Sequence, residues 1–200
     1  MGIEFAVNKN VLIPQPDTEI LVEKAIEILK KHKEPKVLDL CTGSGAIAVS
    51  IAKNVTNAKV YASDISEKAL EIAKINDREN KVKFIYSDLF ENIKENFDVI
   101  VSNPPYIKTE EIKLLSKEVQ NEPNLALDGG QDGLYFYRKI IDKAHEYLTT
   151  TGYLCLEIGE DQKEEVVNLI EQSGHYEEIQ TYKDFGENDR VIICKKYCKK

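Results

Sequence analysis

The segment of this 200-residue chain that points most specifically to chemistry is Asn103-Pro104-Pro105-Tyr106, which directly follows the apolar run FDVIVS. The two prolines hold the backbone extended and remove two N–H donors, so nearby carbonyl groups are free to accept hydrogen bonds. The side-chain carbonyl of Asn103 is a further acceptor. Two acceptors suit a substrate –NH2 group, because they bind both protons and leave the nitrogen lone pair facing elsewhere. With Tyr106 as a flat surface for a planar group, the segment predicts chemistry on a planar amine or amide.

A turn that contains two glycines, Asp39–Gly45 (DLCTGSG), follows another apolar run. Gly43 and Gly45 allow a tight turn and close approach of the backbone to a ligand. The turn is not a full G-x-G-x-x-G motif, because Cys41 stands where the first glycine would be. It is not a Walker loop either, because no Gly-Lys-Ser/Thr follows. The turn therefore predicts a ligand site of some kind but not a phosphate cradle.

Acidic residues end the next two predicted strands. Asp64 follows the glycines by about 20 residues, the place where an acid binds ribose hydroxyls in doubly wound folds. Asp88 ends the following strand. It could accept a hydrogen bond from an exocyclic amine while Leu89 packs on a flat base. One such acid could simply cap a helix or face solvent. With Asp39 near the end of the strand before them, however, three successive strands end in an acid, and this favours a nucleoside site.

These residues all follow strands in a regular alternation of strand and helix. Apolar runs predict strands at 36–41, 59–64, 82–88, 97–103, 152–158, 176–182 and 190–196, and amphipathic stretches predict helices at 46–54, 66–76, 134–148 and 161–172. Such alternation is typical of a parallel sheet with helices on both faces. Ligands of these sheets bind beyond the carboxyl ends of the strands. We therefore predict an α/β fold with a doubly wound, mostly parallel, Rossmann-like sheet of seven strands.

A hairpin and a helix are predicted before this alternation begins. The β-rich stretches 3–7 and 10–13 lie on either side of an Asn-Lys pair and predict a small β-hairpin. An Asp-Thr pair then provides a cap for a helix over about 17–31. The chain is thus expected to consist of an N-terminal hairpin and helix, 1–34, and a main domain, 35–197.

Composition limits the class of protein. The formal net charge is −8, from 27 Lys and Arg against 35 Asp and Glu, which argues against a protein that mainly grips nucleic acid. No apolar run approaches the roughly 18 residues that span a bilayer, and no signal peptide is evident, so we expect a cytoplasmic protein with no membrane partner. The four cysteines lack C-x-x-C spacing, and we predict neither disulfides nor a metal site. The three histidines lie outside these motifs and receive no catalytic role.

Together the motifs resemble the class I S-adenosylmethionine-dependent methyltransferases that methylate planar amino groups. Four longer stretches make the resemblance to the HemK-type release-factor glutamine methyltransferases close over nearly the whole chain: VLIPQPDTEILVE (11–23), NPPYI (103–107), EPNLALDGGQDGL (122–134) and GENDRVIICKK (186–196). Members of that family methylate the side-chain nitrogen of the glutamine in the Gly-Gly-Gln loop of class 1 peptide-release factors. The resemblance implies this activity in translation termination, S-adenosyl-L-methionine as cofactor with S-adenosyl-L-homocysteine as product, a release factor as protein partner, and no direct contact with nucleic acid.

The resemblance also implies which residues act. The target amide would be held by the NPPY segment, that is Asn103, Pro104, Pro105 and Tyr106. The cofactor would contact the turn and the strand ends, through Asp39, Cys41, Thr42, Gly43, Ser44, Gly45, Asp64, Ile65, Asp88, Leu89 and Asn103. Within this set, residues 41–45 would lie against the methionine part, Asp64 would bind the ribose, and Asp88 with Leu89 would bind the adenine. No metal is implied.

The chain departs from the family at three places. Gln15 stands where the family usually has Arg in I-P-R-P, and Cys41 stands where Gly or Ala is more frequent. We expect the helical N-terminal domain with which the family helps to dock the release factor to be absent before the hairpin, and we therefore expect methyl transfer with weak affinity for the substrate protein. The segment 129–131 (GGQ) also reproduces the substrate tripeptide, which we interpret as a coincidence.

Three other functions share part of this pattern. Adenine-N6 methyltransferases of DNA also carry NPPY, because adenine N6 is a planar amine, but they need a basic cleft and usually a target-recognition region. Methylation of a glutamine in a ribosomal protein would use the same site. A non-catalytic cofactor-binding module is the third alternative, and the intact NPPY segment argues against it.

Overall fold

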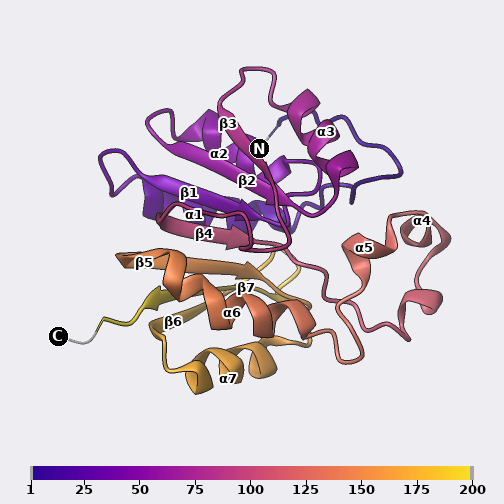
Figure 1. The fold of residues 1–200 in the computed structure, drawn as a ribbon. Helices are drawn as coiled ribbons and strands as arrows, with labels where there is room; N and C mark the ends of the chain where they lie inside the picture. Colours follow the sequence, from indigo (N-terminus) through magenta and orange to yellow (C-terminus); the bar gives the residue numbers. More distant parts are fainter. Residues whose placement is uncertain (1, 199–200) are drawn as a thin grey trace.

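A seven-stranded sheet forms the centre of the computed structural model, which describes residues 2–198 except for the side chain of Glu118. The strand order is β3-β2-β1-β4-β5-β7-β6 (Figure 1). The strands are β1 (Lys36–Leu40), β2 (Lys59–Asp64), β3 (Val82–Tyr86), β4 (Phe97–Ser102), β5 (Leu148–Glu157), β6 (Tyr176–Lys183) and β7 (Asp189–Lys196). Neighbours from β3 to β5 are parallel, and β7 is antiparallel to both β5 and β6. The predicted doubly wound, mostly parallel sheet is confirmed.

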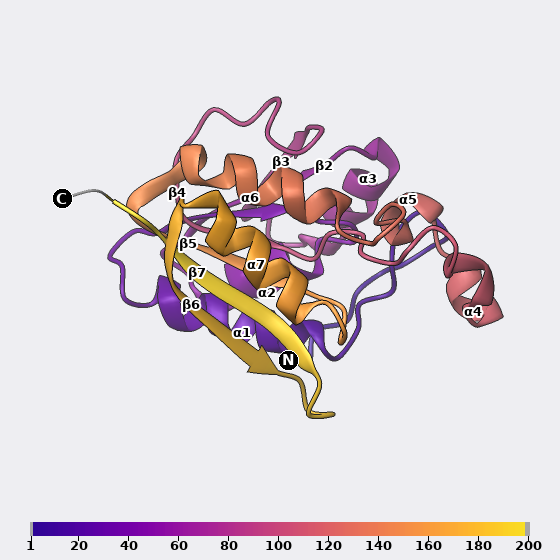
Figure 2. The same cartoon turned by 90° about the horizontal axis from the view of Figure 1, so that it is seen from below.

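Helices cover both faces of this sheet. They are α1 (Thr18–Leu29), α2 (Ala46–Asn54), α3 (Glu67–Asn76), the 3-10 helix η1 (Ile112–Leu114), α4 (Lys117–Gln120), α5 (Asn124–Leu127), α6 (Tyr135–Tyr147) and α7 (Lys163–Ser173). Helices α1 and α2 lie on one face of the sheet and α6 and α7 on the other (Figure 2). Two apolar cores result: Val37 of β1 packs with α1 and α2, whereas Leu38 and Leu40 pack with α6 and α7. Because successive side chains of a strand point to opposite faces, both cores need apolar residues, and β1 supplies them at Val37, Leu38 and Leu40.

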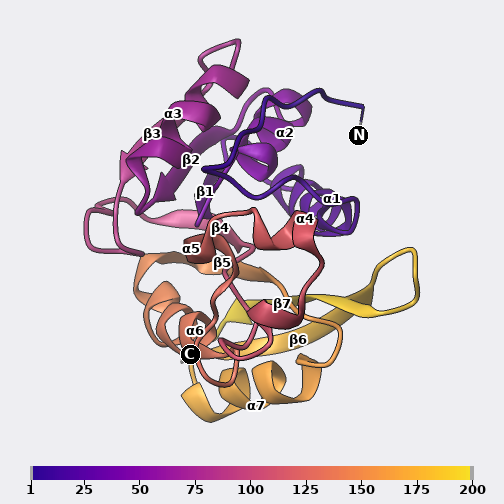
Figure 3. The same cartoon turned by 90° about the vertical axis from the view of Figure 1, so that its right-hand side faces the viewer.

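The strand order reverses between β1 and β4. The chain leaves β1 toward β2 and β3, whereas it leaves β4 toward β5, β7 and β6. Connections that leave in opposite directions open a crevice at the carboxyl ends of the two strands, where ligands of such folds bind. Figure 3 looks onto this end of the sheet and shows α4, α5 and the N-terminal segment lying across it.

The N-terminal β-hairpin prediction is wrong. The described residues before α1 form no strand, although a turn does occur, with Val11 N–H donating to Asn8 O at 3.2 Å. The backbone of Ala6 is bound instead by the side chain of Asn76 on α3, which accepts from Ala6 N at 2.7 Å and donates to Ala6 O at 2.9 Å. The β-rich residues of this segment therefore contact the helical layer and, as described below, line a cavity.

Two further differences from the sequence prediction concern lengths. Strand β5 begins at Leu148 rather than at residue 152, with an irregular register opposite Phe97 and Val99. The long connection between β4 and α6 contains three short helices, η1, α4 and α5, that no periodic pattern predicts because each has only three or four residues. Helices α2 and α3 match the predicted bounds, and the predicted cap Ser66 accepts a hydrogen bond from Ala69 N.

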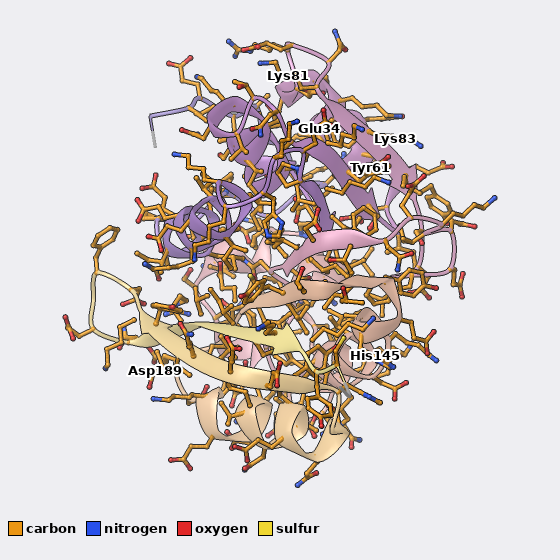
Figure 4. The ribbon with its side chains drawn as sticks, turned by 90° about the vertical axis from the view of Figure 1, so that its left-hand side faces the viewer. Glu34, Tyr61, Lys81, Lys83, His145 and Asp189 are labelled. Atoms are coloured by element: carbon orange, nitrogen blue, oxygen red, sulfur yellow. The ribbon has the colours of Figure 1, made fainter. Side chains whose placement is uncertain are left out.

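The opposite side of the molecule carries none of the residues singled out for chemistry. Figure 4 shows this side, where Tyr61 of β2 faces Lys83 of β3 in register. The Lys83 ammonium lies 5.1 Å from the centroid of the Tyr61 ring, and the edge of Phe97 packs against the same ring. Lys83 places a charged side chain on the edge strand β3, a feature that discourages pairing with another strand.

Some features of other protein classes are missing from the part of the chain that the structure describes. None of its helices has the length and apolar character needed to cross a bilayer. All four cysteines are free thiols. Between residues 2 and 198, no three His, Cys, Asp or Glu side chains are grouped so that they could hold a metal ion.

Asn76→Ala is expected to destabilise the protein, because the buried Asn76 amide also donates to Ser44 O at 2.9 Å and so ties the N-terminal segment to the turn after β1. Losing three hydrogen bonds at a buried site should lower the free energy of unfolding by about 2 kcal/mol. Urea denaturation measures this. Asn54→Ala, at an exposed helix end, is the control and should cost less than about 0.5 kcal/mol. Equal losses in the two variants would contradict the role assigned to Asn76.

Candidate active site

A cavity of about 300 Å³ lies at the carboxyl ends of the strands, at the low end of the range of roughly 300–1,000 Å³ typical of small-molecule sites. Ten of the residues predicted from the sequence line it: Cys41, Thr42, Gly43, Ser44, Asp64, Ile65, Asp88, Leu89, Asn103 and Pro105. The cavity thus brings together the turn after β1, the ends of β2 and β3, and the NPPY segment after β4. The predicted residues Asp39, Gly45, Pro104 and Tyr106 are outside this lining.

Asp39 holds the turn in place through hydrogen bonds. Its side chain is fully buried, and its Oδ2 accepts hydrogen bonds from Thr42 Oγ1 at 2.5 Å and from Ala48 N at 3.1 Å. Burial raises the pKa of Asp39 to about 7, against the effect of these two hydrogen bonds. The side chain therefore fixes the turn to the first residues of α2. Asp39 does not line the cavity, and its contact with a ligand stays a prediction.

The backbone of the turn has left-handed residues on both sides of Thr42. Gly45 has φ +80°, and a Cβ there would lie 3.0 Å from the Cβ of Ala73, so a glycine is needed for α2 to pack on α3. Gly43 has φ +54°, and Cys41, with φ +63°, adopts a conformation that side chains disfavour. This explains why a glycine suits the position of Cys41. Burial raises the pKa of the Cys41 thiol, which keeps it protonated.

Asp64 connects the end of β2 to the turn. Its Oδ2 accepts from Gly43 N at 2.9 Å and its Oδ1 accepts from Ser66 N at 2.8 Å. Burial raises the pKa of Asp64, and these backbone hydrogen bonds oppose the rise. Ser63, the residue before it, is buried and lines the cavity, and within the described part of the chain its hydroxyl has no hydrogen-bond partner. Both residues thus retain hydrogen-bonding capacity that a ligand could use.

The NPPY segment divides between the cavity and the core. Asn103 and Pro105 line the cavity, whereas the ring of Tyr106 packs against the core on the α6–α7 side. Burial raises the pKa of Tyr106 to about 12, with Glu157 adding to the rise and Arg190 opposing it. The hydroxyl of Tyr106 thus interacts with these two residues, and stacking of its ring on a substrate stays a prediction.

Tyr106 instead fixes the path of the segment. Its carbonyl accepts from Nε2 of the buried Gln162 at 2.9 Å. A Cβ on Gly129 would lie 2.7 Å from Tyr106 Cα, and one on Gly133 would lie 2.4 Å from Tyr106 O. The chain can therefore pass Tyr106 only with glycines at these positions. The close approach of Tyr106 therefore explains why the first residue of the GGQ tripeptide is a glycine. Gln131, the last residue of the tripeptide, is exposed.

A further set of lining residues received no role at the site from sequence reasoning. One wall comes from the segment expected to form the hairpin and from the start of α1, and another comes from α5 and α6. They include Asn10, Val11, Leu12, Pro14, Gln15, Thr18, Pro123, Leu125, Ala126, Tyr135, Phe136 and Lys139. Two of the stretches that carry the family resemblance, 11–23 and 122–134, contain most of them, and this was the signal that could have placed them at the site.

Comparison with known proteins identifies the family. Residues 16–186 match the model of the family described as "Methyltransferase small domain". A protein of Clostridium acetobutylicum named release factor glutamine methyltransferase is 46% identical over 201 residues, which cover 96% of this chain and 70% of that protein. The chain belongs to the release factor glutamine methyltransferase family. The predicted family and enzyme class are therefore confirmed.

Two further release factor glutamine methyltransferases show how far the similarity extends. A member from Fusobacterium nucleatum is 44% identical, and the match covers 99% of this chain and 57% of that protein. The chain also matches the crystal structure of a protein-(glutamine-N5) methyltransferase (release factor-specific) from Alicyclobacillus acidocaldarius, with 30% sequence identity and a TM-score of 0.59. That match covers 97% of this chain and 100% of the other chain. The chain thus spans 57% to 70% of the length of the two curated relatives.

Asp39→Asn is expected to change how stability depends on pH. The folded protein holds the Asp39 proton up to a pKa of about 7, whereas the unfolded chain loses it near 3.8. Because the folded state binds more protons between these values, this group's contribution to the free energy of unfolding falls as pH rises, by at most about 1.4 kcal/mol per pH unit. Urea denaturation between about pH 4 and about pH 7 should show a smaller decline for the variant. Asp161→Asn, at an exposed position, should follow the wild type, and parallel curves for Asp39→Asn would refute the assignment.

Proposed function

We propose that this chain transfers a methyl group from S-adenosyl-L-methionine to the side-chain amide nitrogen of the glutamine in the Gly-Gly-Gln loop of class 1 release factors. The observation that carries the proposal is that Asn103 lines the same cavity as the turn after β1 and Asp64. A planar amide held at Asn103 would therefore lie within one cavity with a methyl donor held at the turn. Membership of the release factor glutamine methyltransferase family supports the substrate class.

The lining suits this cofactor chemically. Asp64 and Asp88 offer carboxylates to hydroxyl and amino groups, and Ile65 and Leu89 offer apolar surface to a flat base. The hydroxyl of Ser63 is buried and, among the described residues, has no hydrogen-bond partner. When bound, S-adenosylmethionine supplies a methyl group on a sulfonium, which is already an excellent leaving group, so strong acid catalysis is unnecessary.

The task of the protein is then to orient the amide. An amide nitrogen is a poor nucleophile because its lone pair is delocalised. Asn103 Oδ1 and the Pro104 carbonyl would accept the two protons of the target –NH2, which shifts electron density back to nitrogen and directs its lone pair toward the methyl group. Fixing donor and acceptor in this way can contribute several kcal/mol through proximity and orientation.

The proposal extends to partner and location. The substrate partner is a class 1 release factor, with no direct contact to nucleic acid. We place the enzyme in the cytoplasm, where translation ends and where its four thiols would stay reduced. A glutamine in a ribosomal protein is the second substrate class compatible with an amide at Asn103, and the experiment below separates the two.

The test is transfer of labelled methyl groups to a purified class 1 release factor. Label is expected on the wild-type factor and none on a factor whose Gly-Gly-Gln glutamine is changed to Ala. Equal labelling of both factors, or labelling of ribosomal proteins alone, would overturn the proposed substrate. Mass spectrometry of the enzyme itself, with Gln131 expected to be unmodified, excludes self-methylation as the source of label.

Asn103→Ala should remove most turnover and leave cofactor binding largely intact. Loss of an oriented hydrogen-bonding group at a reacting centre lowers kcat by about 100- to 1,000-fold in other enzymes. Steady-state kinetics measures kcat, and calorimetry should find the Kd for S-adenosylmethionine within about threefold of wild type. Asn96→Ala, at an exposed site, is the control. Near-normal turnover of Asn103→Ala would remove the role assigned.

Asp64→Ala should show the opposite pattern. Loss of a carboxylate that binds a ligand hydroxyl typically costs about 1.5–3 kcal/mol, or roughly 10- to 100-fold in Kd. Calorimetry with S-adenosylmethionine measures this loss, and Asp161→Ala at an exposed position should bind like the wild type. Unchanged affinity of Asp64→Ala would contradict a cofactor site at this residue.

A further inference from the structure

A buried acid that no motif singled out lies directly behind Asn103. Strand β5 pairs with β4 so that Leu156 is opposite Ser102, and the next residues along the two strands are Glu157 and Asn103. The Glu157 residue is 2% exposed and does not line the cavity. Its Oε2 has no hydrogen-bond partner within residues 2–198. A carboxyl group is costly to bury, so its place beside the NPPY segment calls for a function.

Two side chains connect this acid to the cavity. Thr18 and Asn103 both line the cavity, and hydrogen bonding by their side chains favours the charged form of Glu157, which lowers its pKa against the effect of burial. Asn103 Nδ2 also donates to Thr18 Oγ1 at 3.5 Å. A carboxylate can only accept, so the Thr18 hydroxyl must donate to it and keep its lone pairs for Asn103. Both partners therefore bind the –NH2 end of the Asn103 amide.

The orientation of this amide decides what it offers to a substrate. The oxygen and nitrogen ends of an Asn side chain have nearly the same shape, and a 180° rotation exchanges an acceptor for a donor. With Nδ2 bound to Glu157 and Thr18, Oδ1 is the end left to accept a hydrogen bond in the cavity. The rotated amide would place one –NH2 group against another, which would repel the target amide.

We propose that Glu157 is a positioning residue, which fixes the Asn103 side chain with its oxygen toward the target –NH2. It acts through Asn103 and Thr18 and does not contact the substrate. The inference rests on the proposed function, because only a substrate with an –NH2 group requires an acceptor at Asn103. The tests below separate the two.

The groups around Glu157 give the arrangement a pH signature. Asp17 at the start of α1, Arg190 of β7 and Tyr106 face the carboxyl group, and Tyr137 of α6 donates to the Glu157 backbone carbonyl at 2.9 Å. Burial raises the pKa of Glu157 to about 7, Asp17 adds to the rise, and Arg190 opposes it. A protonated carboxyl group can also donate, so it no longer selects the –NH2 end of the amide. Turnover should therefore rise with pH through about 7.

Glu157→Gln tests this in the enzyme with a side chain of the same size. Glutamine presents an –NH2 as well as a carbonyl, so it does not discriminate between the two ends of the Asn103 amide. We expect kcat to fall about tenfold or more, the Kd for S-adenosylmethionine to stay within about threefold, and the rise of kcat through pH 7 to disappear. Glu160→Gln makes the same change at an exposed position and should keep the wild-type values. A Glu157→Gln enzyme with wild-type kcat and pH profile would overturn the proposal.

A spectroscopic readout tests the positioning without any substrate. In the wild-type protein, the NMR signals of the Asn103 side-chain –NH2 should shift as Glu157 titrates, whereas in Glu157→Gln they should be independent of pH in this range. Signals that do not respond to the substitution or to pH overturn the inference. If they respond as expected but no release factor is methylated by the wild type, the proposed substrate fails and the positioning of Asn103 by Glu157 stands.

Discussion

The pairing of three neighbouring strands in register is the constraint on which the site depends. Leu40 of β1 lies opposite Ser102 of β4, and Ser102 lies opposite Leu156 of β5. The strands are parallel, so their next residues, Cys41, Asn103 and Glu157, reach the carboxyl edge together. Because strand order reverses between β1 and β4, this edge is left open, and the turn and the NPPY segment face the same cavity.

A layer of buried carboxyl groups lies under this edge. Asp39 fixes the backbone of the turn, and Glu157 fixes the side chain of Asn103, and in both acids burial raises the pKa to about 7. Burying such groups costs stability unless each finds hydrogen-bond partners, and each of the two has one oxygen without a partner among the described residues. The fold accepts this cost where two groups of the site are held in a fixed orientation.

Much of the fold could be predicted from the sequence, because its signals are local. Continuous apolar runs mark strands buried on both faces, and Ser66 and Gly45 mark where α3 and α2 begin. The hairpin prediction failed because β-rich composition does not distinguish residues that pair with a strand from residues that line a cavity. Motif spacing located the edge of the sheet, but it did not tell which side chains line the cavity, and Asp39 and Tyr106 lie outside that lining. Glu157 belongs to no spacing motif, and only strand register places it beside Asn103.

One wall of the cavity is formed by the segment before α1, and this affects how the cavities of such enzymes can change in evolution. Inserting one residue in a strand turns every following side chain to the other face, which a sheet buried on both faces does not tolerate. The residues between Ala6 and Pro14 take part in no strand pairing and are held at Ala6 by Asn76. Evolution can therefore lengthen or shorten this stretch, and so reshape one side of the cavity, while the register that aligns Cys41, Asn103 and Glu157 is inherited unchanged.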